Sequence, residues 1–543
     1  MRKEVWLVAA AVILGTIVIV AAVFDEPYHI DELLQVSSYS RHLHRTSYTS
    51  LVQQQPPLDP LLNALFERVV GQGDARQRAL SAAFGVGSLI LMGLLCLRAG
   101  LGHMAFLPVL VLAVSPTFAE YTAYARPYAL PMFLMLAFAA STDVWLRDQK
   151  RTAAALSVAS GLALPFSRAL EPPIFLAAAI LILVPKARSE WARWARSRSA
   201  IPIGTAAAGI LLVSLPFAVI ARHQLSRYAA EGFIQFRGLG RFATELAPIL
   251  GQSIPCWPVA LAALAFVLAR KGPGRDPTAP WWWWALFACP LGFATLFFLS
   301  TPADQPYYPR YSFFFLPPLA FVIGLAGRRA GDLWASGGRI LPVAAGVAIA
   351  VFLVSSGTDL AHNLTTTTRA DWAAAARAIE QMTSADTVVL FDHVRPLGAY
   401  RTRFAGAQRY LSPTRKVRSV ADLKADSEDP LQHQQVAVML LGARPYVPGW
   451  RQHQIDAYFT LYLPAHTYRW PAGAANACLA FASRLEGTSG DALRIAAIVI
   501  MARANEFDKA DEMEKELLDS ADPADREAIL RELDRVKAQS SSR

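Results

Sequence analysis

Charged residues are scarce in this chain of 543 residues. They make up 17% of it, whereas an average soluble domain has about 25%. Hydrophobic residues make up 54%, and the mean hydropathy is +0.30. A water-soluble particle of this composition would lack the polar side chains to cover its surface. The composition therefore excludes an ordinary cytosolic enzyme and a disordered chain.

Cysteine is also rare. Four cysteines (Cys96, Cys256, Cys289 and Cys478) are too few for a disulfide framework in a chain of this length, and three of them lie in apolar stretches. We expect those three to be buried as small hydrophobic side chains. The sequence has no Cys-x-x-Cys pair, no His-Glu-x-x-His motif and no glycine-rich phosphate loop, so it predicts no zinc or nucleotide site.

What the sequence does contain is a series of apolar stretches. A helix needs about 20 apolar residues to cross the hydrocarbon core, so the series predicts a polytopic α-helical membrane protein with about eleven transmembrane helices. The first span is predicted to be a retained anchor, because its apolar run continues to Phe24 without a small-residue cleavage site. The expected spans are 5–24, 80–97, 103–119, 128–146, 152–167, 170–185, 200–221, 255–269, 281–300, 311–326 and 339–356.

Basic residues are distributed unevenly between the short loops. With the N-terminus in the cytoplasm, five short loops on that side hold fourteen Arg and Lys residues, and three short loops on the other side hold only Arg126, Arg168 and Arg310. Cytoplasmic loops are typically rich in Arg and Lys, so we predict this orientation. It places the C-terminal part outside the cytoplasm. It also explains much of the formal net charge of +10 without a nucleic-acid partner.

The composition changes after residue 356, where charge returns and long apolar runs end. A helix over 371–382 and strands over 387–391 and 436–441 predict an extracytoplasmic α/β domain. Two helical hairpins near the end resemble tetratricopeptide units. The predicted parts are a transmembrane module 1–356, with a first outer loop 25–79 that carries interfacial helices, the α/β domain 357–487 and a helical segment 488–543.

The first outer loop begins with four acidic residues, Asp25, Glu26, Asp31 and Glu32, within eight positions. Carboxylates at the membrane boundary are costly unless they are solvated or used. One interpretation is a solvated helix start, where the helix dipole favours acidic side chains. The other is a functional acidic cluster, and the Pro-Pro turn later in the loop makes a simple connector less favoured.

Arginines on the predicted outer side stand among tyrosines. Arg126 follows Glu120 and Tyr124, and Arg310 precedes Tyr311. Such arginines can extend to the interface beside an aromatic belt, or they can bind an anion, because a guanidinium matches phosphate oxygens in pairs. Two of them on one side suggest a shared anionic ligand. Arg168 is a third candidate, with Glu171 as an alternative, purely structural partner.

Four motifs occur together: an Asp-Glu pair after the first span, a Pro-Pro-Leu segment some 25 residues later, an Ala-Arg-Pro-Tyr start to the fourth span and a Pro-Arg-Tyr start to a late span. In this combination residues 1–330 resemble the GT-C glycosyltransferases, above all the protein O-mannosyltransferases and aminoarabinose transferases. The resemblance implies a GT-C-type fold. It also implies an enzyme that takes a sugar from a polyprenyl-phosphate carrier at the outer face and passes it, with inversion, to an acceptor hydroxyl.

The resemblance also implies roles for single residues. The family's essential aspartate matches Asp31 best, with Asp25 as the alternative, and Glu32 matches its acidic neighbour. Gln55 stands where the family usually has His before Pro-Pro-Leu, and Tyr124 stands where it often has an acidic residue. These departures leave a requirement for a divalent cation open, and no metal ligand is assigned.

The chemistry of the residues favours the same function. Breaking a sugar–phosphate bond builds negative charge on the phosphate, which Arg126 and Arg310 would stabilise, and Asp31 would accept the acceptor's proton. We predict a glycosyltransferase of a bacterial inner membrane. Its partners would be a polyprenyl-phosphate sugar donor, the lipid bilayer, and a glycan, lipid or protein acceptor.

Two alternatives explain the spans as well. A transporter or flippase of a lipid or sugar would place polar groups near the membrane midplane and often has repeated halves, whereas these spans are nearly free of charge and have no convincing repeat. A non-catalytic scaffold would tolerate charge-preserving changes at Arg126 and Arg310.

Overall fold

The chain divides by its internal contacts into two units, which are described separately. The described residues of the computed structural model, apart from a few single positions near the C-terminus, are 2–25, 58–71, 74–168, 171–188, 200–212, 280–300, 309–337, 339–365, 372–383, 388–391, 417–419, 436–441, 450–454, 459–464 and 507–520.

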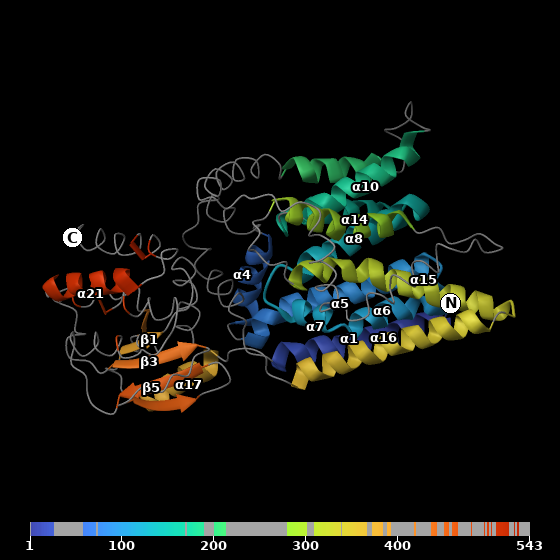
Figure 1. Cartoon of the computed structure of the whole chain (residues 1–543). Helices are drawn as coiled ribbons and strands as arrows, with labels where there is room; N and C mark the ends of the chain where they lie inside the picture. The colour runs from blue at the N-terminus through green and yellow to red at the C-terminus, as the bar shows by residue number, and fades with distance from the viewer. Residues whose placement is uncertain are drawn as a thin grey trace. The chain divides into compact units, whose positions relative to one another are not determined.

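The first unit is a bundle of helices (Figure 1). Within the described residues, five helices are long and apolar enough to cross a membrane, or six if one bent pair is counted as a single span. They belong to α1 (Arg2–Asp25), α5 (Asp74–Arg98), α8 (Ala129–Asp148), α15 (Leu316–Ala335, with the end of the preceding 3-10 helix) and α16 (Ile340–Thr365). The protein is therefore a multi-pass membrane protein, and the count of eleven spans stays a prediction.

Large apolar side chains on the outside of the bundle fit a lipid environment. On α1, Ile13 and Ile17 are each 61% exposed, and on α16, Val351 and Val354 are 57% and 66% exposed. Exposed apolar surface on this scale would be unfavourable in water and marks a contact with lipid or with another protein.

The expected span 103–119 is broken in the structure. A 3-10 turn and α6 (Phe106–Ala113) are followed by α7 (Pro116–Ala123), and the two parts meet at an angle of 66°. The hydroxyl of Ser115 caps α7 by accepting a hydrogen bond from the amide of Phe118 at 3.3 Å, and Pro116 occupies the first helical turn. A Ser-Pro pair is a typical helix start, so the sequence ends one helix here and begins another.

Two helices begin earlier than their apolar runs. The helix α5 starts at Asp74 instead of residue 80, and α4 (Leu58–Val70) starts directly after Pro57, three residues before the apolar run that begins at Leu61. The first turns of α5 carry Arg78, which is 1% exposed and donates through Nη1 to the carbonyl of Val23 at 3.3 Å. Apolar windows fail to predict such a start because its charged residue is buried against α1.

Further helices complete the unit: α9 (Arg151–Ala163), α10 (Glu171–Arg188), a helix over Ala200–Leu212, and α14 (Trp281–Ser300), which packs along α10. The indole of Trp283 donates to the carbonyl of Pro318 at 2.9 Å and ties α14 to α15. Cys96 and Cys289 are buried and free, as the expected small apolar side chains. The expected span 255–269 lies outside the described residues.

The two ends of α8 differ in chemistry. Its C-terminal end carries an ion-pair network in which Asp143 accepts from Arg98 at 2.8 Å and pairs with Arg147 at 3.0 Å. Its N-terminal cap is Tyr128, which lies in an aromatic cluster. Twenty residues separate the ends by about 30 Å, which is the thickness of the hydrocarbon core. The charged and aromatic ends therefore fit opposite faces of a membrane.

The second unit contains a five-stranded sheet with the order β2-β1-β3-β5-β4. Strands β2, β1 and β3 are parallel, and β5 pairs antiparallel with both β3 and β4, with Leu390 opposite Val438 and Met439 opposite Leu461. The helix α17 (Trp372–Met382) contacts β5, and α21 (Phe507–Ser520) follows later in the chain (Figure 1). The strands are β1 (Val388–Phe391), β2 (Val417–Ser419), β3 (Val436–Leu441), β4 (Trp450–Gln454) and β5 (Phe459–Pro464).

The expected helix 371–382 corresponds to α17, and the expected strands 387–391 and 436–441 correspond to β1 and β3. The helix α16 continues to Thr365, past the end expected at residue 356, and the second unit's long C-terminal stretch begins at Thr368. The helical segment 488–543 and the extracytoplasmic placement of this unit stay predictions.

Candidate functional site

Aromatic rings from three segments meet at the aromatic end of α8. Tyr121 of α7 lies 5.0 Å from Tyr128 and 5.9 Å from Phe313, measured between ring centroids. Phe313 belongs to the 3-10 helix η4 (Pro309–Phe315) and also stacks on Phe118 at 6.0 Å. This aromatic cluster joins segments that lie almost 200 residues apart in the sequence. It forms a rigid base for the arginines around it.

Arg126 lies in a tight turn between α7 and α8. The helix α7 ends at Tyr124, whose backbone is extended, and the amide of Tyr128 donates to the carbonyl of Arg126 at 2.7 Å. A bond between residues two apart defines a γ-turn, and Pro127 at its centre restricts the backbone. The guanidinium carbon of Arg126 lies 5.9 Å from the centre of the Tyr128 ring. The Ala-Arg-Pro-Tyr motif therefore holds Arg126 at the aromatic cluster.

Arg168 reaches the same ring from the segment before α10. Its guanidinium carbon lies 4.7 Å from the Tyr128 ring centre and 5.3 Å from that of Phe314. Its Nε donates to the Glu171 carboxylate at 2.9 Å, and its Nη1 lies 3.4 Å from the carbonyl of Pro127. Arg168 and Glu171 are only 15% and 2% exposed. Arg168 thus fixes the turn that carries Arg126, and its charge is balanced by a buried carboxylate.

Glu120 and Tyr124 form a pair one helical turn apart. The Tyr124 hydroxyl donates to Glu120 Oε1 at 2.7 Å. The pair comes directly before Arg126, in the place where the sequence has a tyrosine instead of the family's frequent acidic residue. The nearest acidic side chain is therefore linked to this position through a hydroxyl group.

Arg310 lies in η4, three residues before Phe313, so the aromatic cluster brings its segment to those of Arg126 and Arg168. The helix η4 also contacts α7, α14 and α15. The backbone of Tyr311 belongs to η4, but its side chain lies outside the described residues. Three predicted arginine-bearing segments are thus neighbours in the structure.

The predicted acidic residues are not placed in this way. Asp31, Glu32 and Gln55 lie outside the described residues. Asp25 is the last residue of α1, and its side chain also lies outside them. Within the described part of the chain, no three His, Cys, Asp or Glu side chains form a group that could hold a metal ion. The roles of the acidic residues and of a cation stay predictions.

Sequence reasoning missed Phe313 and Phe314. Phe313 is the meeting point of the aromatic cluster, and Phe314 stacks under Arg168. The Phe313–Phe315 run directly after the Pro-Arg-Tyr motif was the available signal. It reads as an ordinary start of an apolar span, because nothing local shows that the rings face α7 and Arg168.

No protein-family model matches the chain, and no curated protein matches its sequence. Its fold is similar to that of ArnT from Cupriavidus metallidurans bound to undecaprenyl phosphate, with a TM-score of 0.50, 14% identity and coverage of 84% of this chain and 97% of that one. For ArnT from the same organism in the apo state the TM-score is 0.47 at 13% identity, with coverage of 84% of this chain and 97% of that one. For the Archaeoglobus fulgidus oligosaccharyltransferase tethered with an acceptor peptide the TM-score is 0.43 at 13% identity, with coverage of 75% of this chain and 64% of that one.

The likeness to ArnT in its complex carries the comparison. ArnT is an aminoarabinose transferase with a GT-C fold, so the expected resemblance to GT-C glycosyltransferases is confirmed at the level of the fold. At 14% identity the likeness shows the fold alone, and it assigns no substrate to this chain.

Proposed function

We propose that this protein is a membrane glycosyltransferase that takes a sugar from a polyprenyl-phosphate donor and passes it to an acceptor hydroxyl, with inversion. The observation that carries the proposal is the meeting of Arg126, Arg168 and the Arg310 segment at one aromatic cluster, at the end of the bundle away from the basic loops. Arginines at a membrane boundary match the phosphate of such a donor.

The comparison supports the chemical class of the donor. The similar ArnT structure is described as bound to undecaprenyl phosphate, which is a polyprenyl phosphate. A substrate with a long lipid tail also gives a reason for a transferase to be built into a membrane. A transporter would need polar groups near the midplane. In the described part of the bundle, arginines lie instead at the two ends of α8. Arg147 pairs with Asp143 at the C-terminal end, and Arg168 lies over Tyr128 at the N-terminal end.

The proposed reaction breaks the bond between the anomeric carbon of the sugar and the phosphate oxygen, and it forms a bond between that carbon and the acceptor oxygen. The negative charge that develops on the leaving phosphate is stabilised by Arg126 and Arg310, with Tyr124 and Tyr311 beside them. Arg168, which is balanced by Glu171, acts as a positioning residue for the Arg126 turn.

The acceptor's proton goes to a carboxylate of the first outer loop. We assign this role to Asp31, with Asp25 as the alternative and Glu32 as an acidic neighbour. A positioned general base contributes roughly 100- to 10,000-fold to the rate. Attack from the face opposite the phosphate gives inversion. We further propose that the site lies on the periplasmic side of a bacterial inner membrane, which the excess of basic residues in the opposite loops supports.

The experiment is sugar transfer by the purified protein in lipid nanodiscs, supplied with radiolabelled polyprenyl-phosphate sugars and a membrane glycolipid extract as acceptor. Asp31→Asn should lower the transfer rate at least a hundred-fold, and Arg126→Ala should raise the donor concentration needed. Glu67→Gln is the matched control, because Glu67 is a partly exposed acid on α4 in the same outer loop. Full turnover by Asp31→Asn would end the assignment of the base, and lipid transport without transfer would favour the transporter.

A further inference from the structure

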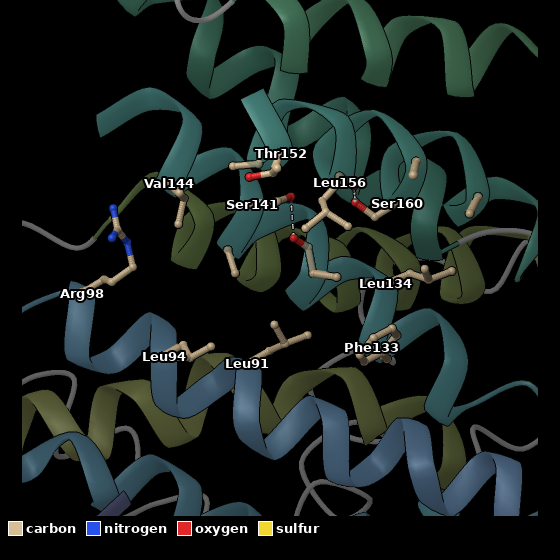
Figure 2. A pocket seen from close by; sticks show the side chains of 15 residues that line it. Leu91, Leu94, Arg98, Phe133, Leu134, Ser141, Val144, Thr152, Leu156 and Ser160 are labelled. Carbon is tan, nitrogen blue, oxygen red and sulfur yellow. Dashed lines mark hydrogen bonds between the residues drawn. The ribbon is translucent and has the colours of Figure 1, made fainter. Parts of the chain in front are cut away.

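An open apolar groove of about 760 Å³ runs along the bundle between α5, α8 and α9 (Figure 2). Leu91 and Leu94 of α5 form one wall. The other consists mostly of small residues of α8 and α9, with Phe133, Leu134, Val144 and Leu156 among them. The alanines lining it are Ala137, Ala140, Ala153, Ala159 and Ala163. These short side chains leave unfilled space, and Leu94 and Leu156 at its sides are 46% and 63% exposed.

Both serine hydroxyls in the groove already make hydrogen bonds within the protein. Ser141 donates to the carbonyl of Ala137 at 2.7 Å, and Ser160 donates to that of Leu156 at 2.6 Å. These two hydroxyls are therefore satisfied within their own helices. The remaining hydroxyl, that of Thr152, stands in the first turn of α9. The groove suits a hydrocarbon chain.

One end of the groove is positively charged. Figure 2 shows Arg98 at that end and Phe133 and Leu134 at the other. Arg98 uses Nε and Nη1 on Asp143 and Asp148, at 2.8 Å and 3.1 Å. Among the described residues nothing accepts from its Nη2. Arg147 also pairs with Asp143, and Lys150 and Arg151 stand at the start of α9, directly after the end of α8. These four cations and the carboxylates of Asp143 and Asp148 carry a net charge of +2.

The start of α9 adds to this charge. Thr152 lines the groove in the first turn of α9, directly after Lys150 and Arg151, and no side chain caps the helix. Cations at a helix N-terminus face the positive end of the helix dipole, which is unfavourable unless an anion is near. An anion held at this rim would relieve that repulsion.

The length of the groove matches one leaflet. From Thr152 to Ala163 the helix rises eleven steps of 1.5 Å, or about 16 Å. Half of a hydrocarbon core is about 15 Å. A hydrocarbon chain of that length therefore fills the groove while its head group stays at the level of Arg98.

We propose that this groove binds an acidic glycerophospholipid of the leaflet at the Arg98 end, with one acyl chain along α8 and the phosphate at the basic rim. Basic pockets between membrane helices are a known way to hold anionic head groups. The lipid is distinct from the donor, whose phosphate we assign to the opposite end of α8. It completes the packing that the alanines leave open and offsets part of the positive charge of the rim.

The test is native mass spectrometry of the purified protein after exchange into equimolar phosphatidylglycerol and phosphatidylcholine. We expect retention of phosphatidylglycerol. Lys150→Gln and Arg151→Gln should each weaken it about five-fold, because a basic residue near an anionic surface contributes about 1 kcal/mol. Ala159→Phe should abolish retention by filling the groove. Arg339→Gln is the control: it removes an exposed charge directly before α16, at a position that does not line the groove, and should leave retention unchanged.

The melting temperature of each variant is measured alongside, and the two charge variants change only exposed side chains. Equal retention of both lipids by the wild type would overturn the proposal. So would full retention by the Lys150→Gln/Arg151→Gln double variant. Added undecaprenyl phosphate that displaces the phosphatidylglycerol would assign the groove to the donor's tail instead.

Discussion

The ion pair between Arg168 and Glu171 is the most sensitive point of the proposed site. Replacement of Glu171 by Gln keeps its volume but leaves Arg168, which is only 15% exposed, without its counter-ion. Loss of one partner of a buried pair typically costs about 3–5 kcal/mol. The amide of Gln can still accept a hydrogen bond, so we expect the free energy of unfolding to fall by about 3 kcal/mol, at the lower end of this range.

The control is an Arg–acid pair one helical turn apart on the surface. Arg328 and Asp332 are 3.9 Å apart, and Asp332 is 72% exposed. Exposed pairs contribute about 0–1 kcal/mol, so Asp332→Asn should change stability by less than that. Both variants are compared by equilibrium unfolding in mixed micelles, followed by tryptophan fluorescence.

A second variant separates charge from packing. The double variant Arg168→Met/Glu171→Leu removes both charges, leaves no buried polar group behind and keeps an apolar chain against Tyr128 and Phe314. Replacing a buried pair by apolar groups is often neutral, so the double variant should recover much of the loss. If Glu171→Gln were no more destabilising than Asp332→Asn, the buried pair would not hold the Arg126 turn, and the positioning role of Arg168 would be refuted.

Three further changes test the packing of the bundle in the same unfolding assay. A β-carbon at Gly85 would lie 2.6 Å from that of Thr122, so Gly85→Val should cost about 1–3 kcal/mol, whereas Gly346, with nothing within 4 Å, should tolerate Val. The Asp143 side chain is 4% exposed and pairs with Arg98 and Arg147, so Asp143→Asn should lower the free energy of unfolding by about 3 kcal/mol. Trp283→Phe removes a 2.9 Å hydrogen bond to α15 and should cost about 1 kcal/mol.

Each of these three predictions can be contradicted by a specific result. Equal losses for the two glycine variants would mean that α5 and α7 do not pack closely. A silent Asp143→Asn would mean that the ion-pair network at the end of α8 is not formed. An unchanged Trp283→Phe variant would place α14 away from the start of α15.

The long helices could be predicted from sequence because apolar length and flanking charge determine them. The expected spans 5–24 and 128–146 agree with α1 and α8 to within three residues at each end. The break in 103–119 was not predicted, although the Ser115-Pro116 pair carried the signal. The early start of α5 could not be predicted, since the burial of Arg78 depends on the carbonyl of Val23 in another helix.

The site was predictable only in part. Positive-inside reasoning and the tyrosine neighbours singled out Arg126, Arg310 and Arg168. That Arg126 and Arg168 lie over one Tyr128 ring depends on tertiary packing, which no local pattern encodes. Phe314 was missed for the same reason. The roles of the acidic residues still rest on sequence alone.

The proposed function depends on Arg126 and Arg310, near the Tyr128 end of α8, holding the phosphate of a polyprenyl carrier. The direct measurement is the affinity of undecaprenyl phosphate for the purified protein, by microscale thermophoresis in detergent. Hydrogen bonds to a charged group contribute about 1.5–3 kcal/mol, so Arg126→Ala should weaken binding about ten- to a hundred-fold, and Arg126→Lys should weaken it less. Equal affinity of wild type and Arg126→Ala would contradict the account.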